Sequence, residues 1–393
     1  MAASHRLPPS NTALVQDIES FRPFTMAHPR LVQAKEELLS AIEGSAPGSL
    51  ILVIGPSGVG KSTLRRRVES ALIEKMRAEI EADPGRIPFI SIEAVAPDNG
   101  VFHWRDHYQR ILAQIQEPAI DHKLGLPRGE GERTANGRYA PWPRGFTGYQ
   151  LQQSIENALR HRRPAAVLID EAQHLGRIAS GRKLADQLDV IKSTASRSNT
   201  VHVLIGTYEL LAFRNLSAQL SRRSVDLHFS RYRTENAEDV EVFQNAVFTF
   251  QKQLRSCEQL DLVKVWDFLY ERSLGCIGIL KDWLMQALIV AARNASPALN
   301  SAILEKTALS ASQCEKMLQE AREGEARLAD NDDNRLRLRR LLNLADQAGA
   351  PTSTVKEPVA PSKKPRGRRT PGVRHPQRDQ IGLPRQAGEA AYA

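Results

Sequence analysis

A short glycine-rich segment offers the clearest chemistry in the sequence. Residues 55–63 read GPSGVGKST, which fits the phosphate-binding pattern G-x-x-x-x-G-K-[ST]. In this pattern the glycines let backbone N–H groups turn toward phosphate oxygens, and the following helix directs its positive end at them. We expect Lys61 to reach the β- and γ-phosphates and the Ser62 hydroxyl to bind Mg²⁺. The segment predicts a nucleotide site formed by Gly55, Pro56, Ser57, Gly58, Val59, Gly60, Lys61, Ser62 and Thr63.

Two adjacent carboxylates follow a second apolar run. Residues 165–169 read AAVLI, and Asp170 and Glu171 come directly after them. One carboxylate at the end of a strand can hold Mg²⁺, and its neighbour can orient and deprotonate a water molecule. We assign Asp170 to the metal and Glu171 to the water; the alternative is that Glu171 is a solvated loop residue.

A third apolar run, residues 201–205, ends at Gly206 and Thr207. Ligands of open parallel sheets gather beyond the carboxyl ends of the strands. Thr207 is therefore predicted to sense the γ-phosphate or the attacking water, although a Gly-Thr pair after a strand is often a simple turn.

Cations elsewhere are candidates for completing such a site. Arg222 and Arg223 precede another β-run, where they could form an exposed face or reach the γ-phosphate of a neighbouring subunit. Arg231 lies close enough in sequence to keep that assignment open. Lys281 begins a helical pattern and is expected to reach back toward the nucleotide.

The elements around these residues alternate between strand and helix. Five apolar runs have strand length, and helical patterns separate most of them, which predicts an α/β fold with a parallel sheet covered by helices. From residue 235 onward the β-runs vanish and amphipathic helices remain. The predicted strands are 50–54, 88–92, 165–169, 201–205 and 225–229.

Composition divides the chain into four parts. Residues 1–27 are Pro-rich and predicted to be irregular, and residues 28–234 form the nucleotide-binding α/β domain. That domain carries a long basic insertion over residues 117–147, which is typical of a functional or disordered loop. Residues 235–345 are predicted to form a helical lid domain, and residues 346–393 a disordered, basic, Pro-rich tail.

Charge and hydropathy exclude several classes of protein. The 393 residues carry a net charge of +9, and no apolar run approaches the length of about 20 residues that a membrane-spanning helix requires. The first residues lack a secretory signal pattern, so we expect a cytoplasmic protein without a membrane partner. Residues 351–393 hold nine Lys and Arg against three Asp and Glu, which suits either nucleic acid or a docking partner.

The pattern resembles an AAA+ ATPase, and more narrowly the TnsC/TniB-type regulators of Tn7-like transposons. The resemblance covers about residues 25–330. The phosphate loop and the strand with two carboxylates indicate the broad superfamily, and the remaining motifs indicate the narrower type. The matching segments are GPSGVGKST (55–63), LIDEAQHL (168–175), LIGTYELL (204–211), QLSRRS (219–224), HFSRYR (228–233) and GCIGILKDWL (275–284).

The resemblance implies an ATPase that binds ATP and Mg²⁺ between subunits and assembles a homo-oligomeric ring or filament on double-stranded DNA. Such proteins pass target-site choice from a target-selection protein to the transposase, and ATP hydrolysis resets the assembly. Arg223 matches the family's finger arginine best. Lys281 falls at the second-sensor position, where many relatives have arginine.

Other functions remain open at this point. The same ATPase fold could serve another client, as a secretion-associated or replication-initiator-like protein. A helicase would need a second α/β motor, and a scaffold without turnover would not need Glu171. For DNA, residues 101–110 and the loop through Arg144 are candidates for sequence-independent phosphate contacts.

Overall fold

The computed structural model describes residues 12–97, 100–116, 147–177, 184–214, 224–254, 260–294, 296, 298–329, 332–342 and 344. The chain divides into two compact units, residues 1–329 and 330–393, and helix α15 (Asp332–Leu341) belongs to the second. Arg222, Arg223 and Arg144 lie outside the described residues. So do the predicted tail, residues 346–393, and the predicted basic insertion up to residue 146.

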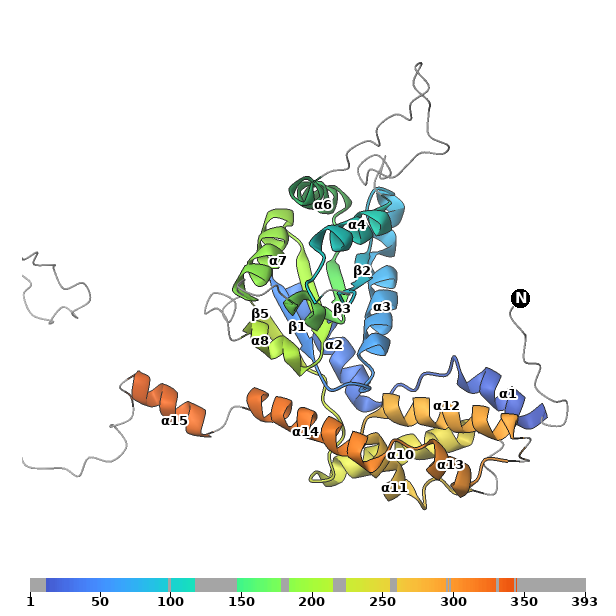
Figure 1. Ribbon diagram of the computed structural model, residues 1–393. Helices are drawn as coiled ribbons and strands as arrows, with labels where there is room; N and C mark the ends of the chain where they lie inside the picture. The colour runs from blue at the N-terminus through green and yellow to red at the C-terminus, as the bar shows by residue number, and fades with distance from the viewer. Residues whose placement is uncertain are drawn as a thin grey trace, which may run out of the picture. The chain divides into compact units, whose positions relative to one another are not determined.

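A five-stranded parallel sheet forms the centre of the first unit (Figure 1). The strand order is β2-β3-β4-β1-β5, and every neighbouring pair is parallel. Each observed strand lies within one residue of its predicted run, which confirms the α/β prediction. The strands are β1 (Leu50–Ile54), β2 (Phe89–Glu93), β3 (Ala166–Asp170), β4 (Val201–Gly206) and β5 (Ser224–His228).

Helices cover both faces of the sheet, which explains why its inner strands are continuous apolar runs. Every residue of β1, β3 and β4 is buried. Successive side chains of a strand point to opposite faces, so Leu50, Leu52 and Ile54 enter one core and Ile51 and Val53 enter the other. One face packs against α2 (Pro29–Gly44) and α3 (Lys61–Ala82), and the other against α4 (Trp104–Ile115), α6 (Gly148–Arg162) and α7 (Leu184–Ser198).

Helix α6, which begins directly after the predicted insertion of residues 117–147, is an element that the sequence analysis did not predict. Its buried residues Leu151, Ile155 and Leu159 recur at a spacing of four, and they pack into the core of that face. Thr147 and Gln150 cap its first turn reciprocally. The apolar spacing and the capping residues are both visible in the sequence, but the Gly and basic residues next to them favoured the prediction of a loop.

The prediction that residues 1–27 are irregular is wrong for residues 12–21, which form helix α1 (Thr12–Phe21). Its side chains Leu14, Ile18 and Phe21 are buried in the core of the helical region, and the Phe21 and Phe250 rings meet edge to face. The apolar spacing of four and three residues supplies one helix face. This face is buried against the helical region, which is distant in sequence, and that contact stabilises α1.

The helical region follows the sheet within the same compact unit, so the predicted boundary between residues 234 and 235 is not a boundary between compact units. We keep the name lid for residues 235–329. Its helices share one apolar core with α1. They are α10 (Ala237–Gln253), α11 (Trp266–Ser273), α12 (Ile277–Arg293) and α13 (Ser301–Thr307), followed by α14 (Ala311–Leu328).

Among the described residues, no single helix is both long and apolar enough to cross a membrane. The pair α11 and α12 meets the length and composition test when joined, across a bend of 109°.

Candidate functional site

The glycine-rich segment forms a tight loop between β1 and α3. Gly58 and Gly60 have φ angles of +75° and +112°, which residues with a Cβ rarely adopt. Lys61 begins α3, is 7% exposed, and donates from Nζ to the carbonyls of Gly55 (3.0 Å) and Pro56 (2.8 Å). Burial lowers the pKa of Lys61, and the nearby Glu171 carboxylate partly offsets this. A buried ammonium held by carbonyls suits an anionic ligand.

The carboxyl end of β3 carries the two predicted carboxylates. Asp170 is 3% exposed; its Oδ1 accepts from the Glu171 backbone N–H (3.0 Å), and its Oδ2 accepts from Nε of Arg65 (3.1 Å). Arg65 also bonds Glu69 and Ser91. Glu171 has a φ of +50°, a conformation uncommon for a residue with a side chain.

Asp170 and Ser62 fit a magnesium site of the kind that uses few protein ligands. Mg²⁺ at phosphates is held by one or two carboxylates, substrate oxygens and water rather than by a protein cage. No group of three or more His, Cys, Asp or Glu side chains in the described part of the chain has metal-binding geometry. The donor set therefore fits a metal that arrives with a phosphate ligand.

The carboxyl end of β4 brings Thr207 beside this group. The Thr207 hydroxyl caps the short helix η2 (Tyr208–Leu210) by accepting from the Glu209 N–H at 3.4 Å. The Thr207 backbone N–H donates to Oε1 of Gln173 (3.3 Å), and Nε2 of Gln173 donates to the Glu171 carboxylate. Gln173 thus joins the ends of β3 and β4.

A cavity of about 660 Å³ opens beside the first half of the loop. Pro56, Ser57, Gln173 and Thr207 line it from the sheet domain. Helix α14 forms another wall, and Gly324 in that wall packs so tightly that an added Cβ would lie 2.1 Å from the Tyr208 ring. The basic side chains in its lining are His174, Arg177, Arg231 and Arg327.

Lys281 lies on the other side of the loop. It donates to the Arg22 carbonyl (3.2 Å) and lines a small cavity of about 50 Å³ together with Gly60, Thr63 and Met26. The predicted lysine is therefore beside the second half of the glycine-rich loop, not in the larger cavity.

The start of α12 contacts the loop through its backbone. The N–H of Ile279 donates to the Gly58 carbonyl at 3.2 Å, and the lid thereby closes over the glycine-rich loop.

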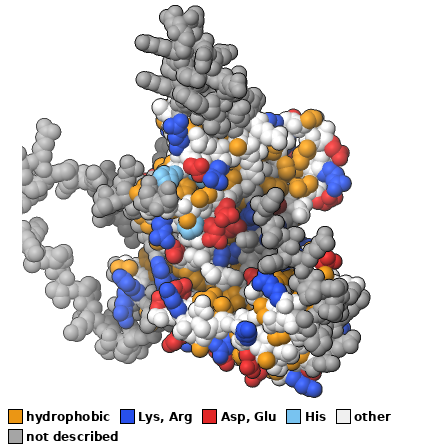
Figure 2. Space-filling view, turned by 45° about the vertical axis from the view of Figure 1, so that its right-hand side comes forward, with side chains coloured by type: hydrophobic (Ala, Val, Ile, Leu, Met, Phe, Trp, Pro, Cys, Tyr) orange, Lys and Arg blue, Asp and Glu red, His pale blue; other side chains and the backbone are white. Residues whose placement is uncertain are grey.

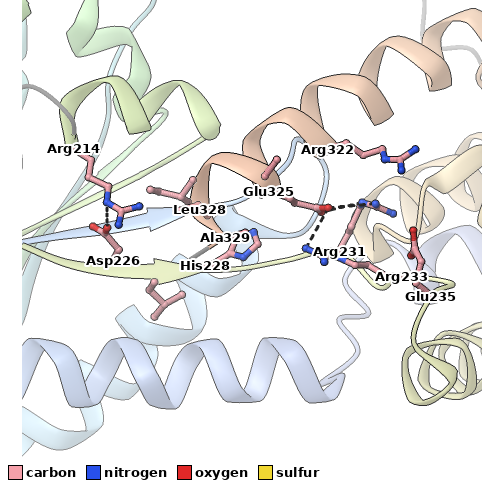
Figure 3. A pocket seen from close by; sticks show the side chains of 13 residues that line it. Arg214, Asp226, His228, Arg231, Arg233, Glu235, Arg322, Glu325, Leu328 and Ala329 are labelled. Atoms are coloured by element: carbon pink, nitrogen blue, oxygen red, sulfur yellow. Dashed lines mark hydrogen bonds and ion pairs between the residues drawn. The ribbon is translucent and has the colours of Figure 1, made fainter. Parts of the chain in front are cut away.

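One of the three finger candidates is engaged within its own chain. Arg231 is 5% exposed and pairs with Glu325 of α14, which also pairs with Arg233 (Figure 3). These residues line a second cavity of about 520 Å³ beside β5, with Arg214 held on Asp226. In this conformation the Arg231 guanidinium is thus paired within its own chain.

The segment predicted to contact DNA turns its aromatic residues inward. Phe102 is 6% exposed, and the Trp104 N–H bonds the Gln187 side chain. Arg105 and Arg110 are exposed, and Arg110 pairs with Asp106. The face shown in Figure 2 mixes Lys and Arg with Asp and Glu across its described part, without one continuous basic stripe.

Comparison with protein families gives a match within the sheet domain. A family model described as an AAA domain matches residues 46–213. The chain is 30% identical over 146 residues to the aliphatic sulfonates import ATP-binding protein SsuB of Cupriavidus pinatubonensis (strain JMP 134 / LMG 1197). That alignment covers 34% of this chain and 45% of the relative, so the chain matches less than half of the relative's length.

Solved structures show distant similarity in architecture. The Aeropyrum pernix ORC1 protein in complex with DNA is 18% identical, with a TM-score of 0.48 and coverage of 74% of this chain and 68% of that one. Drosophila ORC bound to DNA is 16% identical (TM-score 0.43; 78% and 68% covered). The Walker-type ATPase PABY2304 of Pyrococcus abyssi is 17% identical (0.42; 79% and 77%). These scores are too low to carry a functional conclusion.

The family match and the sheet topology together establish an AAA+ P-loop fold followed by a helical region. The finding supports an AAA+ ATPase and implies nucleotide binding. It extends to neither the TnsC/TniB type nor a transposition role.

Proposed function

We propose that this chain binds ATP with Mg²⁺ on the glycine-rich loop and hydrolyses it to ADP and phosphate. The observation that carries the proposal is the convergence of three strand ends: the loop after β1, Asp170 and Glu171 at β3, and Thr207 after β4. Ligands of parallel α/β sheets bind beyond these ends. A buried lysine beside two carboxylates is the arrangement that phosphoryl transfer requires.

Each residue has a distinct part in the proposed reaction. Backbone N–H groups of residues 55–63 and the Lys61 ammonium bind phosphate oxygens, with Thr63 and Lys281 on the side of the smaller cavity. Ser62 and Asp170 would hold Mg²⁺, which supplies charge neutralisation at the phosphates. The Glu171 carboxylate orients a water molecule and accepts its proton. Thr207 senses the γ-phosphate.

Asp170 must exchange one partner for this to occur. Its Oδ2 accepts from Arg65 in the present conformation. Arg65 also has Glu69 as a partner at 2.8 Å, so it can release Asp170 without losing all charge compensation. Asp170 would then hold a divalent cation in place of the guanidinium.

We further propose that the protein works as a homo-oligomer in which Arg223 completes the neighbouring site. An arginine supplied in trans is worth roughly 10³–10⁵ in rate. The pairing of Arg231 with Glu325 supports this choice, because it gives one of the three arginines a partner within its own chain. Arg223→Ala should hydrolyse ATP slowly, and mixing it with Glu171→Ala protein should restore turnover at mixed interfaces.

The client that we propose is double-stranded DNA, in a regulator that links a target-selection protein to a transposase. The support is the resemblance in the motifs and the basic composition of residues 351–393. Binding of this kind is independent of sequence and depends strongly on salt. The alternative is an AAA+ ATPase of the same fold with another client, such as a replication-initiator-like or secretion-associated protein.

Electron microscopy of the full chain with duplex DNA and a slowly hydrolysed ATP analogue tests this proposal. Rings or filaments around the duplex are expected with the analogue, and none are expected without nucleotide. DNA binding at moderate salt should likewise require the nucleotide. Equal DNA affinity with and without nucleotide, or single protomers under all conditions, favours the alternative client.

A further inference from the structure

The cavity beside β5 has no part in the ATPase reaction proposed above. Its volume of about 520 Å³ lies within the range of small-molecule sites. Its lining shares one residue, Arg231, with the lining of the 660 Å³ cavity beside the glycine-rich loop. At one end of it, Arg214 and Asp226 balance each other's charge at 2.9 Å. The rest of the lining therefore decides which ligand the cavity suits.

Guanidinium groups outnumber carboxylates in that remaining part. Glu325 alone pairs with both Arg231 (3.1 Å) and Arg233 (3.2 Å). Arg322 adds a third guanidinium group to the lining. Three arginines and one buried carboxylate leave an excess of two positive charges, of which the exposed Glu235 offsets one at most. The cavity therefore suits an anionic ligand.

The most deeply buried of these arginines is held in place by its own surroundings. Arg231 is 5% exposed, and its Nη1 donates to the Tyr270 hydroxyl at 3.3 Å. That hydroxyl donates in turn to the Tyr232 carbonyl at 3.0 Å. A ligand at this position meets a guanidinium group that is already ordered, which lowers the entropic cost of binding.

Helix α14 presents one face to the cavity. Arg322, Glu325 and Ala326 of the helix, and Ala329 directly after it, line the cavity at spacings of three or four residues. The two alanines have short side chains and leave space beside the arginine. Arg322 lies one helical turn before Glu325, and Figure 3 shows both on the side of the cavity where Arg233 also lies.

We propose that this cavity is a second anion site, which binds a small molecule through a phosphate or pyrophosphate group. The site is separate from the glycine-rich loop and does not depend on ATP hydrolysis. Arg233 and Arg322 supply N–H groups near the opening, and Arg231 supplies the buried end. Guanidinium groups match phosphate oxygens in bidentate geometry, and a phosphate monoester carries a charge of about −1.5 to −2. That charge balances the excess of the lining.

The depth of the site favours a small ligand over the backbone of a nucleic acid. The side chains of Arg231 and Glu325 are 5% and 9% exposed. A duplex presents its phosphates along a rod, and exposed cations on a protein surface neutralise them. Such a rod could approach Arg322, but it is too wide to reach the buried guanidinium group.

A ligand in this site would also stabilise the position of α14. It would join Arg322 of the helix to Arg233 after β5. Two residues after Arg322, Gly324 packs so closely on Tyr208 that an added Cβ would lie 2.1 Å from the ring. Tyr208 lines the cavity beside the glycine-rich loop. We therefore expect the ligand to raise the melting temperature of the chain and to hold the helix against that cavity.

Calorimetric titration of the full chain with pyrophosphate, without Mg²⁺ and at constant ionic strength, tests the proposal. Two pyrophosphate sites are expected, one at the glycine-rich loop and one in the cavity beside β5. Lys61→Met should remove the first and keep the second with a Kd below about 1 mM. Arg322→Gln should weaken the second at least about tenfold, because it removes a charge-assisted contact.

Lys316→Gln is the matched control for Arg322→Gln. Lys316 is an exposed cation of the same helix and belongs to the lining of neither cavity. Arg322 is exposed as well, so both variants should fold. Lys61 is buried, and if Lys61→Met does not fold, the unmodified chain saturated with ADP gives the same measurement, because ADP fills the glycine-rich loop.

Three results would overturn the proposal. The first is loss of all pyrophosphate binding in Lys61→Met or in the chain saturated with ADP. The second is an equal Kd for Arg322→Gln and Lys316→Gln. The third is binding of short duplex DNA that requires Arg322 in a chain that does not bind pyrophosphate beside β5. If the site beside β5 is found but Lys61→Met removes no pyrophosphate site, the inference stands and the proposed nucleotide site is refuted.

Discussion

Gly278 of α12 stands so close to Gly58 of the glycine-rich loop that an added Cβ on Gly278 would lie 2.3 Å from the Gly58 carbonyl oxygen. A Cβ on Gly58 would meet the Ile279 side chain at the same distance. The first turn of α12 and the loop therefore pack backbone against backbone. Any movement of the lid changes the immediate surroundings of the phosphate loop.

Gly278→Ala should push α12 away from the loop. We expect a loss of about 1–3 kcal/mol in the free energy of unfolding, typical of overpacking, and ATP binding weakened by at least about fivefold. Chemical denaturation and equilibrium titration with a fluorescent ATP analogue measure the two effects. Gly148→Ala is the control, since nothing lies within 4 Å of the Cβ added there. Equal behaviour of the two variants would show that the contact is unimportant.

Arg65→Gln should leave the Asp170 carboxylate buried without its cation. The side chain of Asp170 is 5% exposed, and breaking a buried pair costs about 3 kcal/mol or more. Mg²⁺ with ADP should raise the melting temperature more in this variant than in the unmodified protein, because the ion replaces the lost charge. Arg77→Gln, which loses an exposed pair on the same helix, is the control. Similar nucleotide-induced shifts in both variants would argue against Asp170 as a metal ligand.

Glu325→Gln should release α14 from the strand end beside β5. Glu325 is 9% exposed and pairs with both Arg231 and Arg233, so its loss leaves the buried guanidinium of Arg231 uncompensated. The expected cost is about 3–5 kcal/mol in the free energy of unfolding. Glu323→Gln on the exposed side of the helix should change stability by less than about 0.5 kcal/mol. Denaturant titration measures both, and a difference below 1 kcal/mol would disprove this assignment.

Buried histidines make stability depend on pH. Burial lowers the pKa of His28, His107 and His202 to about 4, so these rings are neutral in the folded chain at pH 7. The unfolded chain binds protons near pH 6.5. Stability is therefore complete above about pH 6.5 and falls as pH decreases toward 4, by roughly 2 kcal/mol for each histidine at pH 5.

Denaturant titrations at pH 7.5 and 5.0 check this dependence. His107→Phe keeps the ring among its aromatic neighbours and removes the titrating group, so it should lose less stability at pH 5.0 than the unmodified chain does. The same loss in both proteins would indicate that other groups govern the acid limb of stability.

The strands of the sheet were predictable because the signal for a buried parallel strand lies within a few consecutive residues. Buried parallel strands are short apolar runs, and β1, β3 and β4 lie within one residue of their predicted bounds. Because strands and helices alternate along the chain, the loop after β1, Asp170 and Thr207 could also be predicted to lie at one edge of the sheet. The family match over residues 46–213 confirms the AAA+ fold, whereas the transposition role stays a prediction.

The contacts around the site were not predictable, since they join residues that are distant in the chain. Arg65 and Asp170 are 105 positions apart, and Arg231 and Glu325 are 94 apart. Lys281 was expected at the nucleotide, and the structure adds its bond to the Arg22 carbonyl. Gln173 carried one signal, its place two residues after Glu171, but only the fold reveals Thr207 as its second partner.

Single-turnover hydrolysis of γ-labelled ATP by Glu171→Gln tests the central claim most directly. We predict that this variant binds ATP and Mg²⁺ with nearly unchanged affinity and releases phosphate at least about 100-fold more slowly than the unmodified protein. Glu209→Gln, which alters an acid that lines the 660 Å³ cavity beside the loop, should hydrolyse at close to the normal rate. Normal phosphate release by Glu171→Gln, or failure of the unmodified protein to hydrolyse ATP at all, would contradict the account.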